Sequence, residues 1–239
     1  MAVVEYAGGG MTSALNTASA TTTVAVPLFT GTAAGQPIIL AVASDASTGS
    51  WTTPSGWTVL KATVAVNTDM VTAAFYKYSS GAESSTVSLT GPSGHMVGGS
   101  ISLRCASSTS LGATIGTTSS VDTSTTSPTS GGTLSPAVRT NGLAVRICVC
   151  SSHSNAANGT LTPPASGWTT QQKFINSSSS SAFCTGISFS TQLSSAPAAA
   201  ATASASGGSA WMVVDSWFIP GAYPAGLRVL QAVSNAASL

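Results

Sequence analysis

The pattern that most constrains this chain is the lack of any sustained helical stripe of apolar residues. Gly, Pro, Ser and Thr interrupt every window before apolar side chains can recur at i, i+3, i+4 and i+7. Short segments rich in β-branched or aromatic residues, bounded by turn formers, are frequent instead. We expect strands at 21–26, 37–43, 58–66, 70–78, 85–90, 95–105, 143–150, 169–175, 182–190, 198–203 and 210–219. The sequence therefore predicts an all-β fold.

Composition distinguishes a folded chain from a disordered one. Only 5% of the residues are charged, whereas 43% are hydrophobic, and five Trp, six Phe and four Tyr can anchor a core. Disordered chains are usually poor in hydrophobic residues and rich in net charge. A chain of 239 residues can also bury a sizeable core without disulfides. We expect an antiparallel β-sandwich with a surface of hydroxyl groups and backbone.

An internal repeat divides the chain into two related halves. The segment TPSGWT at 53–58 returns as PASGWT at 164–169. In each half an apolar strand precedes this turn, and the half closes with a strand after a double glycine. The repeat predicts a jelly-roll-like sandwich built from two sequence-related halves. The halves are expected at about 21–106 and 136–221, within a sandwich at 21–221.

The Ser/Thr-rich crossover at 107–135 allows two arrangements. It is either a flexible linker between two sandwiches or a crossover with edge strands that interleaves the halves in one sandwich. We favour interleaving, because about 75 residues per half is few for an independent domain. Residues 1–20 and 222–239 fall outside the repeat, and we expect a docking arm and a tail, with a short helix at 227–237.

The repeated Gly-Trp step has two interpretations. Gly56 and Trp57, with Gly167 and Trp168, are expected to be structural turn anchors, because glycine permits the turn and tryptophan begins the next strand with a large apolar face. The alternative is a platform of Trp51, Trp57 and Trp168 that stacks on sugar rings of a host-surface glycan. Packing is favoured, since a tryptophan that begins a strand is usually buried.

Catalytic chemistry is not indicated by the titratable residues. The carboxylates and histidines fall in no spacing typical of a paired acid and base, and neither a nucleophile elbow nor a phosphate loop is present. We expect no enzyme activity, no catalytic residues and no cofactor. His95 is expected in a turn or at a strand start, and Asp215 in an ion pair with a donor such as Arg104 or Arg146. The residues considered are Glu5, Asp45, Asp69, Glu83, Asp122, Asp215, His95 and His153.

Several classes of partner are also disfavoured. The cysteines lack the spacing of a zinc site or a disulfide framework, so buried free thiols and no metal are expected. The net charge of +1, with scattered basic residues, disfavours nucleic acid as a partner. No apolar run approaches the roughly 20 residues that cross a bilayer, and no signal pattern opens the sequence. We expect no membrane partner and a chain kept in the cytoplasm. The cysteines are Cys105, Cys148, Cys150 and Cys184.

With these residues in view, the chain resembles small virion structural proteins of tailed bacteriophages, especially phages of actinobacteria. The resemblance covers about residues 20–221. It differs after Ala34-Gly35, where usual members carry more Asp and Leu and this chain has Gln36-Pro37. The shared elements are the strand from Ala34 to Val42, the turn at 53–58, Tyr76-Lys77, Gly142–Val145, the turn at 164–168, and Pro220-Gly221.

The resemblance implies a non-enzymatic β-sandwich of the virion. The favoured role is a capsid decoration or minor head protein, assembled in the host cytoplasm and present in many copies. Its expected partners are the major capsid protein or other virion proteins, and copies of itself. The alternative is a tail-associated module that binds host cell-wall glycan. The low charge predicts that assembly depends on buried apolar area and strand pairing, and that it responds little to salt.

Overall fold

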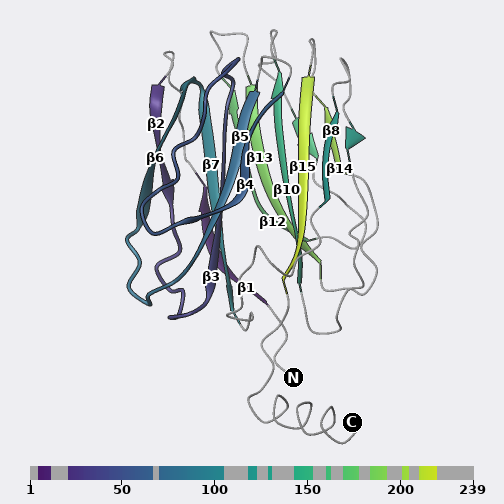
Figure 1. The fold of residues 1–239 in the computed structure, drawn as a ribbon. Helices are drawn as coiled ribbons and strands as arrows, with labels where there is room; N and C mark the ends of the chain where they lie inside the picture. The colour runs from purple at the N-terminus through teal and green to yellow at the C-terminus, as the bar shows by residue number, and fades with distance from the viewer. Residues whose placement is uncertain are drawn as a thin grey trace, which may run out of the picture.

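The computed structural model describes residues 5–11, 21–66, 70–104, 118–122, 129–130, 143–152, 160–162, 169–177, 184–192, 201–204 and 210–219. All regular structure in these residues is β-strand, and every strand pair is antiparallel (Figure 1). No helix long and apolar enough to cross a bilayer occurs among them. The prediction of an all-β sandwich is confirmed. The helix expected at 227–237 lies outside the described residues.

The first sandwich is built from residues 5–104. Its larger sheet has the order β1-β7-β3-β5-β4, and its smaller sheet pairs β2 with β6. Residues 5–11, which the sequence assigned to a docking arm, form edge strand β1 of the larger sheet. The strands are β1 Glu5–Met11, β2 Thr21–Pro27, β3 Pro37–Ser44, β4 Thr58–Val66, β5 Met70–Tyr78, β6 Thr86–Gly94 and β7 Met96–Arg104.

The second sandwich is built from strands between residues 118 and 219. Its larger sheet has the order β12-β13-β10-β15-β8, and its smaller sheet has the order β11-β14-β9. Strands β8 and β9 lie within the stretch expected as a crossover. The strands are β8 Thr118–Asp122, β9 Thr129–Ser130, β10 Leu143–Ser152, β11 Thr160–Thr162, β12 Thr169–Ser177, β13 Cys184–Gln192, β14 Ala201–Ser204 and β15 Ala210–Ile219.

The two larger sheets have the same strand order. When the strands of the two larger sheets are matched in chain order, β1 corresponds to β8, β3 to β10, β4 to β12, β5 to β13 and β7 to β15. Corresponding strands occupy the same places in their sheets. A register shift also follows the second residue of both β4 and β12, between Val59 and Lys61 and between Thr170 and Gln172. Among the described strands each sheet draws on one half of the chain, which is a side-by-side arrangement rather than an interleaved one.

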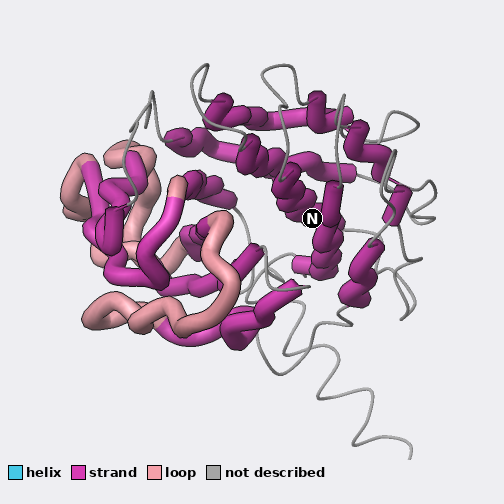
Figure 2. The backbone as a smooth tube through the Cα atoms, turned by 90° about the horizontal axis from the view of Figure 1, so that it is seen from above, coloured by secondary structure: helices cyan, strands magenta, loops and turns pink. Residues whose placement is uncertain are grey.

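The sheets lie in successive layers, with the small β2-β6 sheet at one side and β14 at the other (Figures 1 and 2). One hydrophobic cluster fills the space between the β2-β6 sheet and the first larger sheet. A second cluster joins the two larger sheets face to face. Strand β3 is buried on both faces, because Ile38 and Leu40 belong to the first cluster and Ile39 and Ala41 to the second. The two sandwiches therefore share a core.

Candidate functional site

The first Gly-Trp turn is a tight turn that delivers a tryptophan into the core. The Trp57 backbone N–H donates to the Pro54 carbonyl oxygen at 3.1 Å, and Gly56 has a φ of +78°. A positive φ at the third position is the mark of a type II turn, which favours glycine there. Trp57 is 8% exposed and packs in the cluster that also contains Phe75. This geometry suits a turn anchor.

Trp51 is held even more firmly. Its indole N–H donates to the Val71 carbonyl oxygen at 3.1 Å, and its side chain lies against the backbone of Gly91 on β6. Trp51 is 5% exposed, so neither this ring nor that of Trp57 presents an open face for stacking on a sugar. The burial of both rings favours packing over a glycan platform. Gly167 and Trp168 lie outside the described residues.

Lys77 and Glu83 form an ion pair beside Trp57. The Lys77 ammonium lies 5.3 Å from the centroid of the Trp57 ring, a cation–π distance, and pairs with the Glu83 carboxylate. Burial by itself would raise the pKa of Glu83, but the hydrogen bonds from Lys77 and from the Ser80 backbone, with the charge of Lys77, leave that pKa below its ordinary value of 4.5. Glu83 therefore keeps its negative charge to a lower pH than an ordinary glutamate does.

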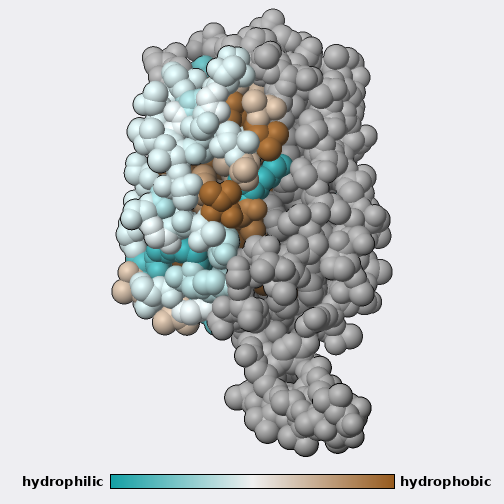
Figure 3. All heavy atoms as spheres, viewed as in Figure 1, coloured by the Kyte–Doolittle hydropathy of each residue, from teal (hydrophilic) through white to brown (hydrophobic). Residues whose placement is uncertain are grey.

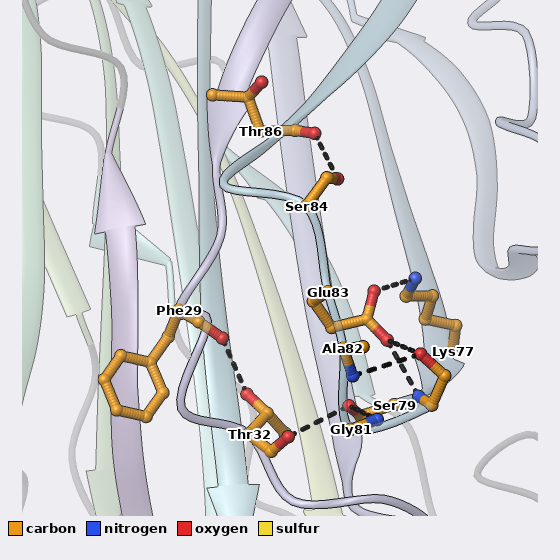
Figure 4. Close-up of polar contacts among 10 residues, drawn as sticks. Phe29, Thr32, Lys77, Ser79, Gly81, Ala82, Glu83, Ser84 and Thr86 are labelled. Carbon is orange, nitrogen blue, oxygen red and sulfur yellow. Dashed lines mark hydrogen bonds and ion pairs between the residues drawn. The ribbon is translucent and has the colours of Figure 1, made fainter.

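Polar contacts stabilise the loop between β5 and β6 (Figure 4). The Ser80 N–H donates to Glu83 Oε1 at 2.8 Å, and the Ser79 hydroxyl donates to the Thr32 carbonyl oxygen at 3.1 Å. Ser79 Oγ also accepts a hydrogen bond from the Gly81 N–H at 2.9 Å. These serines and this carboxylate satisfy backbone groups of their own loop and, at Thr32, of the loop between β2 and β3. Their role is to order the loop.

His95 and Asp45 form a partly buried corner where the chain passes from the small sheet to the larger one. His95 is the single residue between β6 and β7, as its expected turn position requires. Its backbone N–H donates to Asp45 Oδ1 at 2.6 Å, and its Nδ1 lies 2.6 Å from Asp45 Oδ2. A Cβ added to Gly94 would lie 2.5 Å from Asp45 Oδ1, so glycine is needed for this close approach. The Asp45–His95 pair therefore links the end of β3 to the junction between β6 and β7.

The ion pair expected for Asp215 stays a prediction, because the Asp215 side chain lies outside the described part of the structure. Arg104 pairs with Glu5, with Nη2 and Oε2 2.7 Å apart. Arg146 is 1% exposed and lies opposite Ser216 in the register, whereas Asp215 lies opposite Ile147. Each carboxylate whose side chain is described thus serves a structural pair, namely Glu5, Asp45 and Glu83.

The described residues hold no cluster of three or more His, Cys, Asp or Glu that could bind a metal ion. Cys148 and Cys150 lie in β10 and Cys184 lies in β13, but their side chains are outside the described part of the structure, and so is the whole of Cys105. The expectation of buried thiols therefore stays a prediction. The contacts that sequence reasoning missed are the Asp45–His95 and Lys77–Glu83 pairs. Their members lie 50 and 6 residues apart, in no motif that would join them.

The chain matches no protein-family model, no curated protein and no solved structure. Its fold and contacts define it as an all-β sandwich protein. Its function has to be inferred from its own residues and geometry.

Proposed function

We propose that this chain is a non-enzymatic structural protein of a virus particle, a capsid decoration or minor head protein on the outer shell of a tailed bacteriophage. The observation that carries the proposal is a double sandwich whose described carboxylates are all engaged in pairs that fasten the fold. Catalysis needs titratable groups gathered in a pocket, with pKa values suited to proton transfer. Carboxylates that stabilise loops and strand junctions suit a structural protein that acts through contacts with neighbouring proteins.

The outer surface of the first sandwich also supports a role in packing against neighbours. Strands β2 and β6 expose hydroxyl groups, at Thr22, Thr23, Thr86, Ser88 and Thr90. With only 5% charged residues and a net charge of +1, copies placed side by side on a shell would repel one another weakly. Hydroxyl-rich strands offer hydrogen bonds without the desolvation cost of charges.

The test is to locate the chain in intact particles. Phage particles whose genome encodes this chain would be purified on a density gradient, analysed by mass spectrometry and labelled with an antibody against the chain. We expect many copies on the head, retained when the salt concentration rises from about 0.1 to 0.5 M, because few ion pairs contribute to binding. Absence from purified particles would overturn the proposal. Label confined to the tail would replace it by the tail-associated alternative.

A further inference from the structure

An apolar stripe runs along β4, the strand at one end of the first larger sheet. No described strand pairs with its outer edge. Val59 is 44% exposed and is the one exposed large hydrophobic residue among the described residues. Hydrophobic side chains gather on the face where β4 lies (Figures 1 and 3). The β4 stripe consists of Val59, Ala62 and Ala65, which are exposed, and Leu60 and Val64, which are partly buried against the core.

The matching strand of the second sandwich has a different edge. Strand β12 begins after the second Gly-Trp step, as β4 begins after the first, and the shared bulge aligns their first residues. A second bulge, between Lys61 and Val64, occurs only in β4. The positions that match Val59, Leu60 and Ala62 carry Thr170, Gln171 and Lys173. Beyond the second bulge, the positions that match Val64 and Ala65 through the neighbouring strands carry Phe174 and Ile175. Polar residues and a lysine are the usual means of keeping an edge strand from pairing. The β12 edge has them at the first three of these positions, where β4 has only apolar residues.

The β4 stripe is also symmetric along the strand. Reversing the strand about Ala62 places Val59 on Ala65 and Leu60 on Val64, so every position of the stripe falls on an apolar position. Val66, at the end of β4, falls on Thr58. Lys61, the strand's one charged residue, falls on Thr63, so no like charges lie directly opposite. A twofold contact between identical chains requires this kind of self-complementary surface.

We propose that the β4 stripe is the surface through which two copies of this chain associate, antiparallel about a twofold axis that passes through Ala62. Two bulges interrupt β4, so the contact relies on apolar side chains more than on a continuous backbone ladder. One strand contributes little beside the roughly 800 Å² per partner of stable complexes, so isolated chains dimerise weakly. The inference rests on the proposed function, because many copies held on one shell make a weak contact effective.

Sedimentation velocity of the purified full chain, at protein concentrations up to about 1 mM, measures the contact directly. The Ala62→Lys variant would set two new ammonium groups against each other on the axis, and we expect it to weaken dimerisation at least about tenfold. Thr170→Lys is the matched control, since it adds the same charge at an exposed position of the β12 edge. It should leave the monomer–dimer equilibrium unchanged. Circular dichroism and melting temperature establish that both variants fold.

Each outcome decides the inference. A concentration-dependent dimer that Ala62→Lys abolishes and Thr170→Lys retains supports it. A monomer throughout, a dimer that survives Ala62→Lys, or equal loss in both variants overturns it. Because no particle is used, a chain that does not dimerise leaves the virion proposal to its own test. Likewise, a chain absent from particles can still show the β4 contact.

Discussion

The two sandwiches have the same strand order but differently composed interiors. One row across the first larger sheet contains Phe75 and Leu40 on neighbouring strands, both almost fully buried. The matching row of the second sheet, aligned by the shared bulge, has Ser190 and Arg146 at these places. Both rows continue with a serine, Ser100 or Ser216. A buried arginine beside small residues thus occupies the row that a leucine and a phenylalanine fill in the first sandwich.

This difference teaches that the strand order does not depend on one set of core side chains. Cores tolerate exchange when the total volume and the alternating pattern are retained. A long arginine between two serines distributes volume differently from leucine beside phenylalanine, and both arrangements bury the central strand. What the halves share is the Gly-Trp step in the sequence, the bulge after it and the succession of strands. These common features suffice for the same topology.

The largest expected effect on stability comes from introducing into the first sandwich the arginine that the second sandwich has at the matching position. Leu40→Arg would bury a cation among apolar groups at a site that is 0% exposed, and we expect a loss of at least about 4 kcal/mol of unfolding free energy. Arg146→Leu should cost less, because leucine leaves no buried charge at this position, although the interaction that Arg146 makes is lost. Urea denaturation of both variants measures the difference. A larger loss for Arg146→Leu would mean that the second core depends on its charge.

Removing the corner carboxylate is expected to cost less than Leu40→Arg. Asp45→Ala would leave the partly buried His95 N–H and imidazole without this acceptor, and we expect a loss of about 1–2 kcal/mol. The matching strand end of the second sandwich carries Ser151, and Ser151→Ala should cost below about 1 kcal/mol. Amide hydrogen exchange of β6 and β7 tests whether the corner opens first. Equal losses in the two variants would show that the corner is not special to the first sandwich.

The Lys77–Glu83 pair predicts a pH dependence that belongs to the first sandwich. Lys77 lies opposite Ile38, and the matching position in the second sheet is Gln192. Because the folded-state pKa of Glu83 is lowered, its contribution is complete above the ordinary value of 4.5 and is lost as the pH falls through the folded value. Glu83→Gln should cost about 1–2 kcal/mol at pH 7 and progressively less in acid. A cost that is constant from pH 7 to about 3 would contradict the pair's role.

The smallest effect concerns the Gly-Trp step that both halves carry in the sequence. Gly56→Ala places a side chain in a left-handed conformation, although no atom lies within 4 Å of the added Cβ. We expect a loss of about 1 kcal/mol, from backbone conformation alone. Gly167→Ala should cause the same loss if the second turn has the same conformation. Thermal melts of the two variants compare the turns, and a neutral Gly167→Ala would mean that the second copy turns differently.

The sequence predicted most of the strands because their signals are local. Strands β4, β5 and β15 have the expected bounds, and β2, β3, β6, β7, β10, β12, β13 and β14 are displaced by at most a few residues. The strands that were missed, β1, β8, β9 and β11, consist largely of Gly, Ser and Thr. Strand β1 pairs with β7, and its Gly8 makes room for the ring of Phe29 from the segment after β2. No local pattern encodes a strand that depends on such distant partners.

The sequence by itself determined that the chain is all-β, where most strands lie and where the tight turn must occur, because alternation, β-branching and glycine act within a few residues. Only the tertiary structure decided that each half completes its own sheets, that the two larger sheets pack face to face, and that Asp45 meets His95. These outcomes depend on register and on which apolar face covers which. Such contacts join residues far apart in the chain, and composition leaves them open.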